Sequence, residues 1–141
     1  MEILVAIAIL AIIGGLTFSS FSIYKNRENV RSVSLKIVAM LEEARSKTLA
    51  STGQEQYGVR IEENSAVMFS GSSYSALNEV GSSVTFITGV NATTTLSASI
   101  TDVVFNRLSG ETDNYGTVTI SSNTETASST IVIYKTGIVE I

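Results

Sequence analysis

The sequence predicts an α+β fold in which one long N-terminal helix packs against an antiparallel β-sheet. Three observations support this prediction. An uncharged apolar run opens the chain, a helical period of hydrophobic residues follows it, and the rest alternates short runs rich in Val, Ile and Thr with turn residues. The 141 residues contain no proline, so proline breaks neither half of the helix.

The first segment, residues 1–24, carries a single charge, on Glu2. Its most apolar part, Ile3–Leu16, reads ILVAIAILAIIGGL. As a helix, the 22 uncharged residues from Ile3 to Tyr24 would span roughly 33 Å. Since the hydrocarbon core of a bilayer is roughly 30 Å thick, we expect a helix that can reside in a membrane.

The second segment, residues 25–52, has the period of an amphipathic helix, with charged residues on its other faces. Thr52-Gly53 is expected to end this helix, because glycine readily adopts the left-handed conformation at a C-terminal cap. The apolar stripe should pack on the sheet, and it consists of Val30, Val33, Ile37, Leu41, Ala44 and Thr48.

The third segment, residues 53–141, reads as an antiparallel β domain, because strands follow one another without intervening helices. A stretch rich in Gly and Ser, Gly71–Ser82, is expected to form a loop. The expected strands are Gln56–Ile61, Ala66–Ser70, Ser83–Thr88, Thr94–Ile100, Asp102–Arg107, Gly116–Ser121, Thr130–Lys135 and Gly137–Ile141.

Composition and charge argue against several classes of function. Through Ala50 the chain has six Lys/Arg against four Asp/Glu, and from Ser51 onward it has three against nine. This acidic domain disfavours nucleic acid phosphates, so no nucleic acid partner is expected. The absence of Cys and His removes thiolate chemistry, the usual general base and the commonest metal ligand. We therefore expect neither an enzyme nor a cofactor.

Three short strings match the signatures of penicillin-recognising serine enzymes, namely Ser22–Lys25, Ser121–Asn123 and Lys135–Gly137. That chemistry needs the Ser and its Lys at the start of a helix buried in a helical domain. No such domain is expected here, and we attribute the match to the abundance of Ser and Thr.

The opening MEILVAIAILAIIGGL resembles the N-terminal helix of type IV pilins and type II secretion pseudopilins. In that family a Glu leads an apolar run of the type LLVAIAILAII, which Glu2 and Ile3–Ile13 match almost residue for residue. The family's Glu lies further from the cleavage point than Glu2 lies from Met1, so it stays open which terminal amine Glu2 would meet. A cleaved signal peptide would instead need a basic segment before the apolar run.

The resemblance implies a pilin-like fold and a structural role in an extracytoplasmic filament. Such a subunit resides in the inner membrane, is handled by the pilus assembly machinery and then forms a helical homo-oligomer outside the cell. Gly14 and Gly15, as weak helix formers, are candidates for a segment that unwinds in the filament, or for close helix packing in the membrane. The residues implied in assembly are Glu2, Ile3, Leu4, Val5, Ala8, Leu10, Ile13 and Leu16.

The order of the elements also resembles the GspH/FimT-like branch of pilin-like proteins. Ala44-Arg45-Ser46 matches the end of its long helix, Val104-Phe105 and Gly110 match a strand that leads into a loop, and Ile131–Ile141 matches its terminal strand pair. A minor pseudopilin of a secretion system is therefore one alternative to a pilus subunit. A membrane-anchored extracytoplasmic binding domain that never polymerises is another.

Two clusters of charged and polar residues have more than one interpretation. Glu111, Asp113 and Asn114 offer oxygen ligands of the kind that Ca²⁺ prefers, but a solvated hairpin turn explains them equally, and we assign no metal. The cations Arg27, Arg31 and Lys36 fit lipid headgroups, acidic residues of neighbouring subunits, or a solvated helix face.

Overall fold

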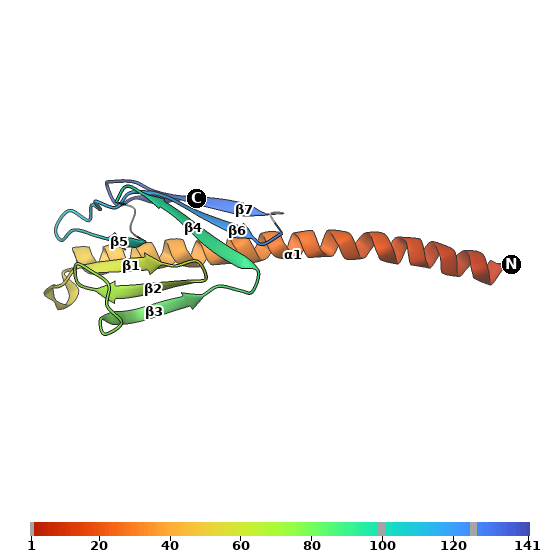
Figure 1. The fold of residues 1–141 in the computed structure, drawn as a ribbon, viewed down its shortest axis with the longest axis horizontal. Helices are drawn as coiled ribbons and strands as arrows, with labels where there is room; N and C mark the ends of the chain where they lie inside the picture. The colour runs from red at the N-terminus through yellow and green to blue at the C-terminus, as the bar shows by residue number, and fades with distance from the viewer. Residues whose placement is uncertain (1, 99–100, 125–126) are drawn as a thin grey trace.

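The computed structural model describes residues 2–98, 101–124 and 127–141, with only the backbone of residues 15–22. It has an α+β architecture, with one long helix and two antiparallel sheets of four strands. Helix α1 spans Glu2–Leu49 without interruption, and a short 3-10 helix, η1 (Thr52–Gln54), follows it. The N-terminal half of α1 projects beyond the sheets, while its C-terminal half lies against them (Figure 1).

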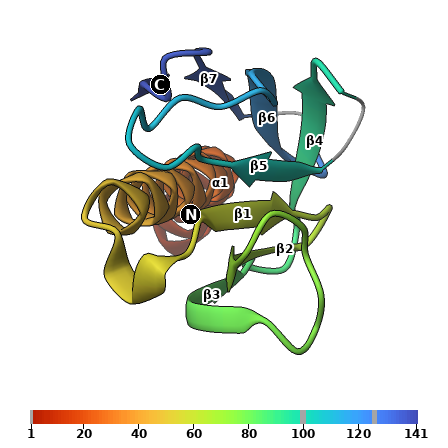
Figure 2. The same cartoon turned by 90° about the vertical axis from the view of Figure 1, so that its left-hand side faces the viewer.

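The first sheet has the strand order β3-β2-β1-β5, and the second has the order β4-β6-β7-β8. In Figure 2, a view along α1, the first sheet lies below and beside the helix and the second lies above it. The strands are β1 (Tyr57–Ile61), β2 (Ser65–Ser70), β3 (Glu79–Thr85), β4 (Val90–Leu96), β5 (Asp102–Val104), β6 (Gly116–Ser122), β7 (Ser128–Ile133) and β8 (Val139–Glu140).

The prediction of a single sheet is wrong. The chain leaves the first sheet after β3, forms β4 in the second sheet, and returns to pair β5 with β1 before it completes the second sheet. Backbone hydrogen bonds join the two sheets, including the one from Ala92 N to Glu63 O at 2.8 Å. Two sheets can cover a wider arc of the helix than one, so both contribute to the same core.

Several predicted boundaries are also wrong. Strand β3 begins at Glu79, inside the expected loop Gly71–Ser82, and β4 begins at Val90 rather than Thr94. Within β4, Val90, Ala92 and Leu96 face the core, whereas the Thr run that suggested the later strand lies mostly on the outer face. The expected end of that strand, residues 99–100, lies outside the described residues.

The other predicted boundaries differ at segment ends. Helix α1 ends at Leu49, because Ser51 already has the left-handed conformation, with a φ of 51°. Strand β5 stops at Val104, where the chain turns into a loop, and not at Arg107. Strand β7, Ser128–Ile133, begins and ends two residues earlier than expected, and β8 is only Val139–Glu140.

The apolar stripe of α1 is buried, as predicted, at all six of its positions. The C-terminal half of the helix contacts strands of both sheets, so this stripe forms the centre of the core. Side chains from both sheets complete the cluster, among them Val59 and Met68 of the first sheet and Val118 and Ile131 of the second. Among the described residues, no helix combines the length and the apolar character needed to cross a membrane.

Thr48 joins the end of α1 to the first strand. Its buried hydroxyl donates a hydrogen bond to Ala44 O at 2.8 Å and accepts one from the backbone N–H of Tyr57 at 2.9 Å. A buried N–H group needs such a partner, because water cannot reach it. This pair of hydrogen bonds therefore fixes where the chain leaves the helix and enters β1.

Thr48→Val keeps the shape of the side chain but removes the acceptor for the N–H of Tyr57. A buried donor without a partner costs about 1–3 kcal/mol, so the free energy of unfolding should fall by about that amount. Ser34→Ala is the matched control, because the buried hydroxyl of Ser34 donates only to Val30 O, at 2.9 Å, a carbonyl that α1 already pairs. Chemical denaturation compares the two variants, and equal losses would contradict this role for Thr48.

Candidate functional site

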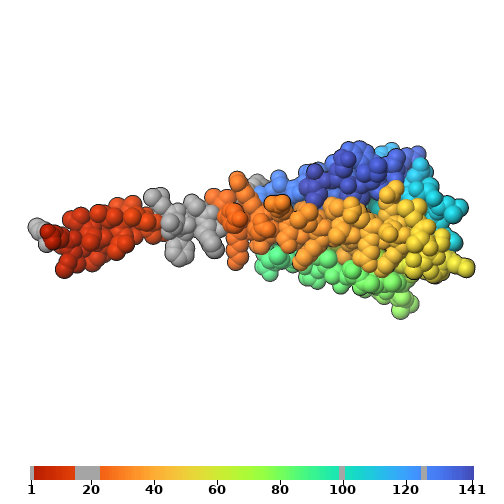
Figure 3. Space-filling view, turned by 180° about the vertical axis from the view of Figure 1, so that it is seen from behind, coloured from red at the N-terminus to blue at the C-terminus, as the bar shows by residue number. Residues whose placement is uncertain are grey.

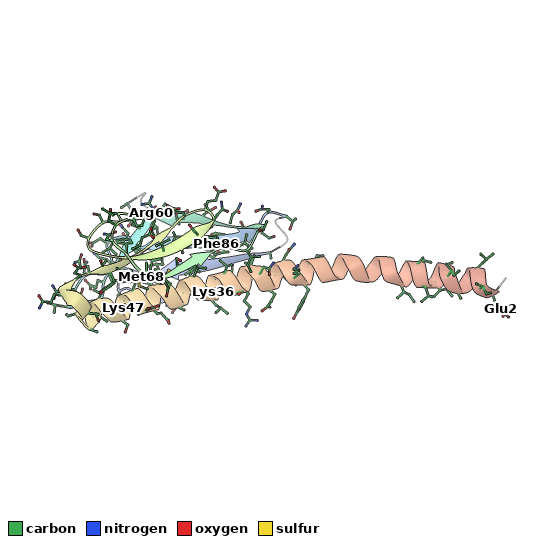
Figure 4. The ribbon with its side chains drawn as sticks, turned by 90° about the horizontal axis from the view of Figure 1, so that it is seen from below. Glu2, Lys36, Lys47, Arg60, Met68 and Phe86 are labelled. Atoms are coloured by element: carbon green, nitrogen blue, oxygen red, sulfur yellow. The ribbon has the colours of Figure 1, made fainter. Side chains whose placement is uncertain are left out.

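The projecting half of α1 exposes an apolar surface. From Ile3 to Ile13 its large apolar side chains are between 52% and 76% exposed in the single chain, the extremes being Ile9 and Ile3. Glu2 is also exposed and lies at the tip of this projection, far from the sheets (Figure 4). Apart from Leu16, whose side chain is outside the described residues, the residues predicted to act in assembly therefore lie together on a segment that no described part of the β domain covers.

The predicted unwinding segment begins at Gly14 and Gly15, next to the part of α1 of which only the backbone is described. The backbone of α1 is helical through Gly14 and Gly15, and the side chains from Gly15 to Ser22 lie outside the described residues. The expectation that this segment unwinds concerns the assembled state, so it remains a prediction. In the single chain the helix is continuous.

The C-terminal half of α1 has an uncovered outer face. Seen from behind, the helix surface lies open between the strands of the two sheets (Figure 3). Leu35 and Leu49, on this half of α1, are 51% and 43% exposed. A shallow groove borders the end of this face, between Arg45 and Leu49 of α1 and Ile138 beside β8. The exposed surface of α1 thus continues from the projecting segment onto the domain.

The loop between β5 and β6, here called the distal loop (residues 106–113), lies at the end of the domain remote from Glu2 (Figure 1). Arg45 holds it to α1, since its Nε donates to Gly110 O at 3.2 Å and its Nη2 donates to Thr136 O at 3.3 Å. One guanidinium therefore fastens the helix end, the distal loop and the turn between β7 and β8. The sequence does not predict this role, although Arg45, Gly110 and the terminal strand pair Ile131–Ile141 were all singled out from it.

The turn between β7 and β8 depends on a glycine. Gly137 has a φ of 77°, and a Cβ atom there would lie 1.9 Å from Gly110 O. A side chain at this position would push the turn away from the distal loop and from Arg45. The close approach explains why a Thr-Gly pair stands at this turn.

The residues weighed as calcium ligands lie in the distal loop, except Asn114, which directly follows it. Glu111 and Asp113 are exposed, and the side-chain amide of Asn114 donates to Asp102 O at 2.8 Å. Within the described part of the chain, no three His, Cys, Asp or Glu side chains gather as a metal would require. The structure therefore adds no support for a calcium site here.

A second groove, here called the proximal groove, lies where α1 leaves the domain. It is lined by Arg27, Val30 and Arg31 of α1, by residues 127–129, and by Ile141. Both arginines are exposed, and no described carboxylate lies within ion-pair distance of either one. Like charges four residues apart destabilise a helix by about 0.2–0.5 kcal/mol, an effect that the exposed Glu28, three residues before Arg31, offsets in part.

A charged cluster on the outer face of the first sheet is already satisfied within the chain. Arg60 pairs with Glu62 at 2.9 Å and with Asp102 at 3.2 Å, and its guanidinium lies over the ring of Tyr74. The hydrogen bond to Glu62 is the main reason that the pKa of Arg60 is raised above its ordinary value. Likewise, a hydrogen bond to Glu79 raises the pKa of Tyr74. These contacts hold the loop between β2 and β3 over the sheet. The charges of Arg60, Glu62 and Asp102 are paired within the chain, so they are not available to a ligand.

Of the three strings that match serine-enzyme signatures, the third lies apart from the other two. Asn26 donates a hydrogen bond to Thr124 Oγ1 at 3.2 Å, which places Ser121–Asn123 close to the part of α1 that follows Lys25. The side chain of Ser22 is outside the described residues, and Lys25 follows on the projecting end of α1. Lys135 belongs to the turn at the opposite end of the domain, where its backbone oxygen accepts a hydrogen bond from Thr112 N.

Comparisons of the chain with protein-family models, with curated proteins and with solved structures found no match. The functional interpretation therefore rests on the chain's own sequence and geometry.

Proposed function

We propose that this protein is a structural subunit of an extracytoplasmic filament of the type IV pilus kind. The subunit resides in the inner membrane before assembly, and polymerisation then buries residues Ile3–Leu16 among the same segments of other copies. The observation that carries the proposal is the projecting half of α1, whose large apolar side chains are all more than half exposed between Ile3 and Ile13.

The size of this apolar surface supports the proposal. Burying one large apolar side chain contributes about 1.5–3 kcal/mol, so covering this segment would contribute on the order of 10 kcal/mol for each subunit. The β domain cannot cover it, because the segment projects away from both sheets (Figure 1). An apolar helix of this kind is stable in a bilayer or in a bundle of like helices, because both shield its side chains from water.

The position of Glu2 favours a bundle of like helices as the final state. A carboxylate at the head of an apolar run is costly to bury unless it meets a cation. In a filament the terminal amine of its own or a neighbouring chain would supply that cation through a charge-assisted hydrogen bond. In a simple membrane anchor the same carboxylate would stay in contact with water at the end of the apolar run and would need no partner.

Two other functions share part of this support. A minor pseudopilin of a type II secretion system would use the same helix in a shorter assembly. A membrane-anchored binding domain would use the helix only to stay in the membrane, and polymerisation of the purified chain separates this alternative from the other two.

Removing the projecting segment should make the protein soluble and monomeric. A chain that begins at Arg27 keeps the whole buried core, which starts at Val30, and loses the exposed apolar run. Sedimentation in detergent-free buffer should show a monomer for this chain and large assemblies or membrane association for the full chain. A full chain that remains monomeric without detergent would contradict the proposal.

Glu2→Ala should abolish or sharply reduce filaments while leaving the β domain folded. Removing one partner of a buried ion pair costs about 3–5 kcal/mol, because the other charge stays buried alone. Glu2→Asp should be partly defective, since it keeps the carboxylate but shortens its reach. Electron microscopy counts the filaments, and immunoblotting checks the subunit level.

Glu28→Ala is the control for Glu2→Ala, because it removes an exposed carboxylate from the same helix outside the apolar run. It should assemble normally. A plain anchor predicts that Glu2→Ala inserts as well as the unchanged protein or better, so normal filaments in Glu2→Ala would rule out the pairing role.

A further inference from the structure

The distal loop presents an acidic and apolar surface to the outside. Glu111 and Asp113 are exposed, and neither makes an ion pair with a described residue. Leu108 is 89% exposed and has a φ of 72°, a backbone conformation that a bulky residue rarely adopts. Strain of this kind is typically kept where an element serves a function.

The distal loop is also held in one conformation before any partner arrives. Asn106 N donates to Glu111 O at 2.7 Å, and Gly110 N donates to Asn106 O at 2.9 Å. The guanidinium of Arg107 is turned back onto Gln54 O at 2.7 Å, so the loop's own cation is directed at η1. Together with Arg45, these contacts order the loop in advance, which reduces the entropy lost on binding.

The proximal groove offers the complementary charge at the other end of the same domain. Arg27 and Arg31 provide two exposed guanidinium groups, and Val30, Ala127 and Ile141 provide apolar walls. From Arg31 to Arg45, which holds the distal loop, α1 advances about 20 Å. The groove and the loop of one chain therefore cannot meet each other, whereas a second copy displaced along the helix axis brings them together.

We propose that the distal loop of one copy docks in the proximal groove of the next copy. Glu111 and Asp113 face Arg27 and Arg31, and Leu108 packs against the apolar wall of the groove. A contact between two different surfaces of identical chains propagates without closing, as an open filament requires. This inference rests on the proposed function, and it assigns a contact between β domains in addition to burial of the apolar helix.

Charge reversal in the full chain tests this contact. Polymer is measured by sedimentation after detergent removal for Arg27→Glu with Arg31→Glu, for Glu111→Lys with Asp113→Lys, and for all four changes together. Like charges in contact oppose association, so each pair should reduce the pelleted polymer by about tenfold or more. The fourfold variant should recover most of the loss, because it restores opposite charges across the contact.

Salt gives a second readout of the same contact. At an ionic strength of about 1 M the Debye length falls to about 3 Å, so the difference between each reversed pair and the unchanged protein should shrink. Leu108→Ala should reduce the polymer at both ionic strengths, because its contribution does not depend on charge. A loss for the reversed pairs that does not respond to salt would overturn the electrostatic contact.

Two controls exclude simpler explanations. Glu55→Lys with Glu63→Lys makes the same change in net charge at exposed carboxylates outside the distal loop and should polymerise normally. Glu125 lies outside the described residues, and Glu125→Gln tests whether it neutralises the arginines within the chain. Unchanged polymer in Glu125→Gln supports the proposal, whereas a rise would show that the arginines are already paired within the chain and would overturn it. Thermal unfolding of each variant, with the midpoint unchanged, confirms that the domain remains folded.

Other outcomes are also decisive. Normal polymer from both reversed pairs overturns the docking contact and leaves the proposed function standing. If only the arginine reversal fails, and it also loses binding to vesicles of anionic lipid, then the groove faces a membrane surface and the proposal is wrong. If the unchanged protein forms no polymer at all, the proposed function fails together with this contact.

Discussion

The structure depends on the burial of one stripe of α1 against two sheets at once. Val33, Ile37 and Leu41 are almost fully enclosed by side chains from both sheets, so neither sheet has a complete core without the helix. Thr48 and Arg45 then fix the helix end, through hydrogen bonds to β1, to the distal loop and to the last turn. The domain is thus organised around the C-terminal half of a helix whose other half lies outside it.

That division gives the two halves of α1 different tasks. The apolar stripe of the C-terminal half is buried within one chain, whereas the N-terminal half exposes apolar residues along its whole described length. Under the proposed function, this exposed half of α1 would enter a bilayer first and a bundle of like helices later. In this account the charges of the domain set the register between neighbours, and the apolar segment supplies most of the free energy of association.

The sequence was most informative where one periodicity dominates. All six residues predicted for the apolar stripe, from Val30 to Thr48, are buried, because a helix repeats its buried face every three to four residues; Ser34 and Met40, which are also buried, were not predicted. The division into two sheets was not predictable, because alternation within a strand does not say which strand it pairs with. Strand β5 pairs with β1 from far along the chain, and only packing around α1 decides that choice. Arg45 was missed as a fastening residue for the same reason, since its two carbonyl partners are distant in sequence.

A helical reconstruction by electron cryomicroscopy of the polymer formed by the full chain tests the central claim most directly. The account predicts that the segments Ile3–Ile13 of many copies pack together at the axis, with the β domains facing outward. A polymer held together only by β domains, with these segments exposed on its surface, would contradict it.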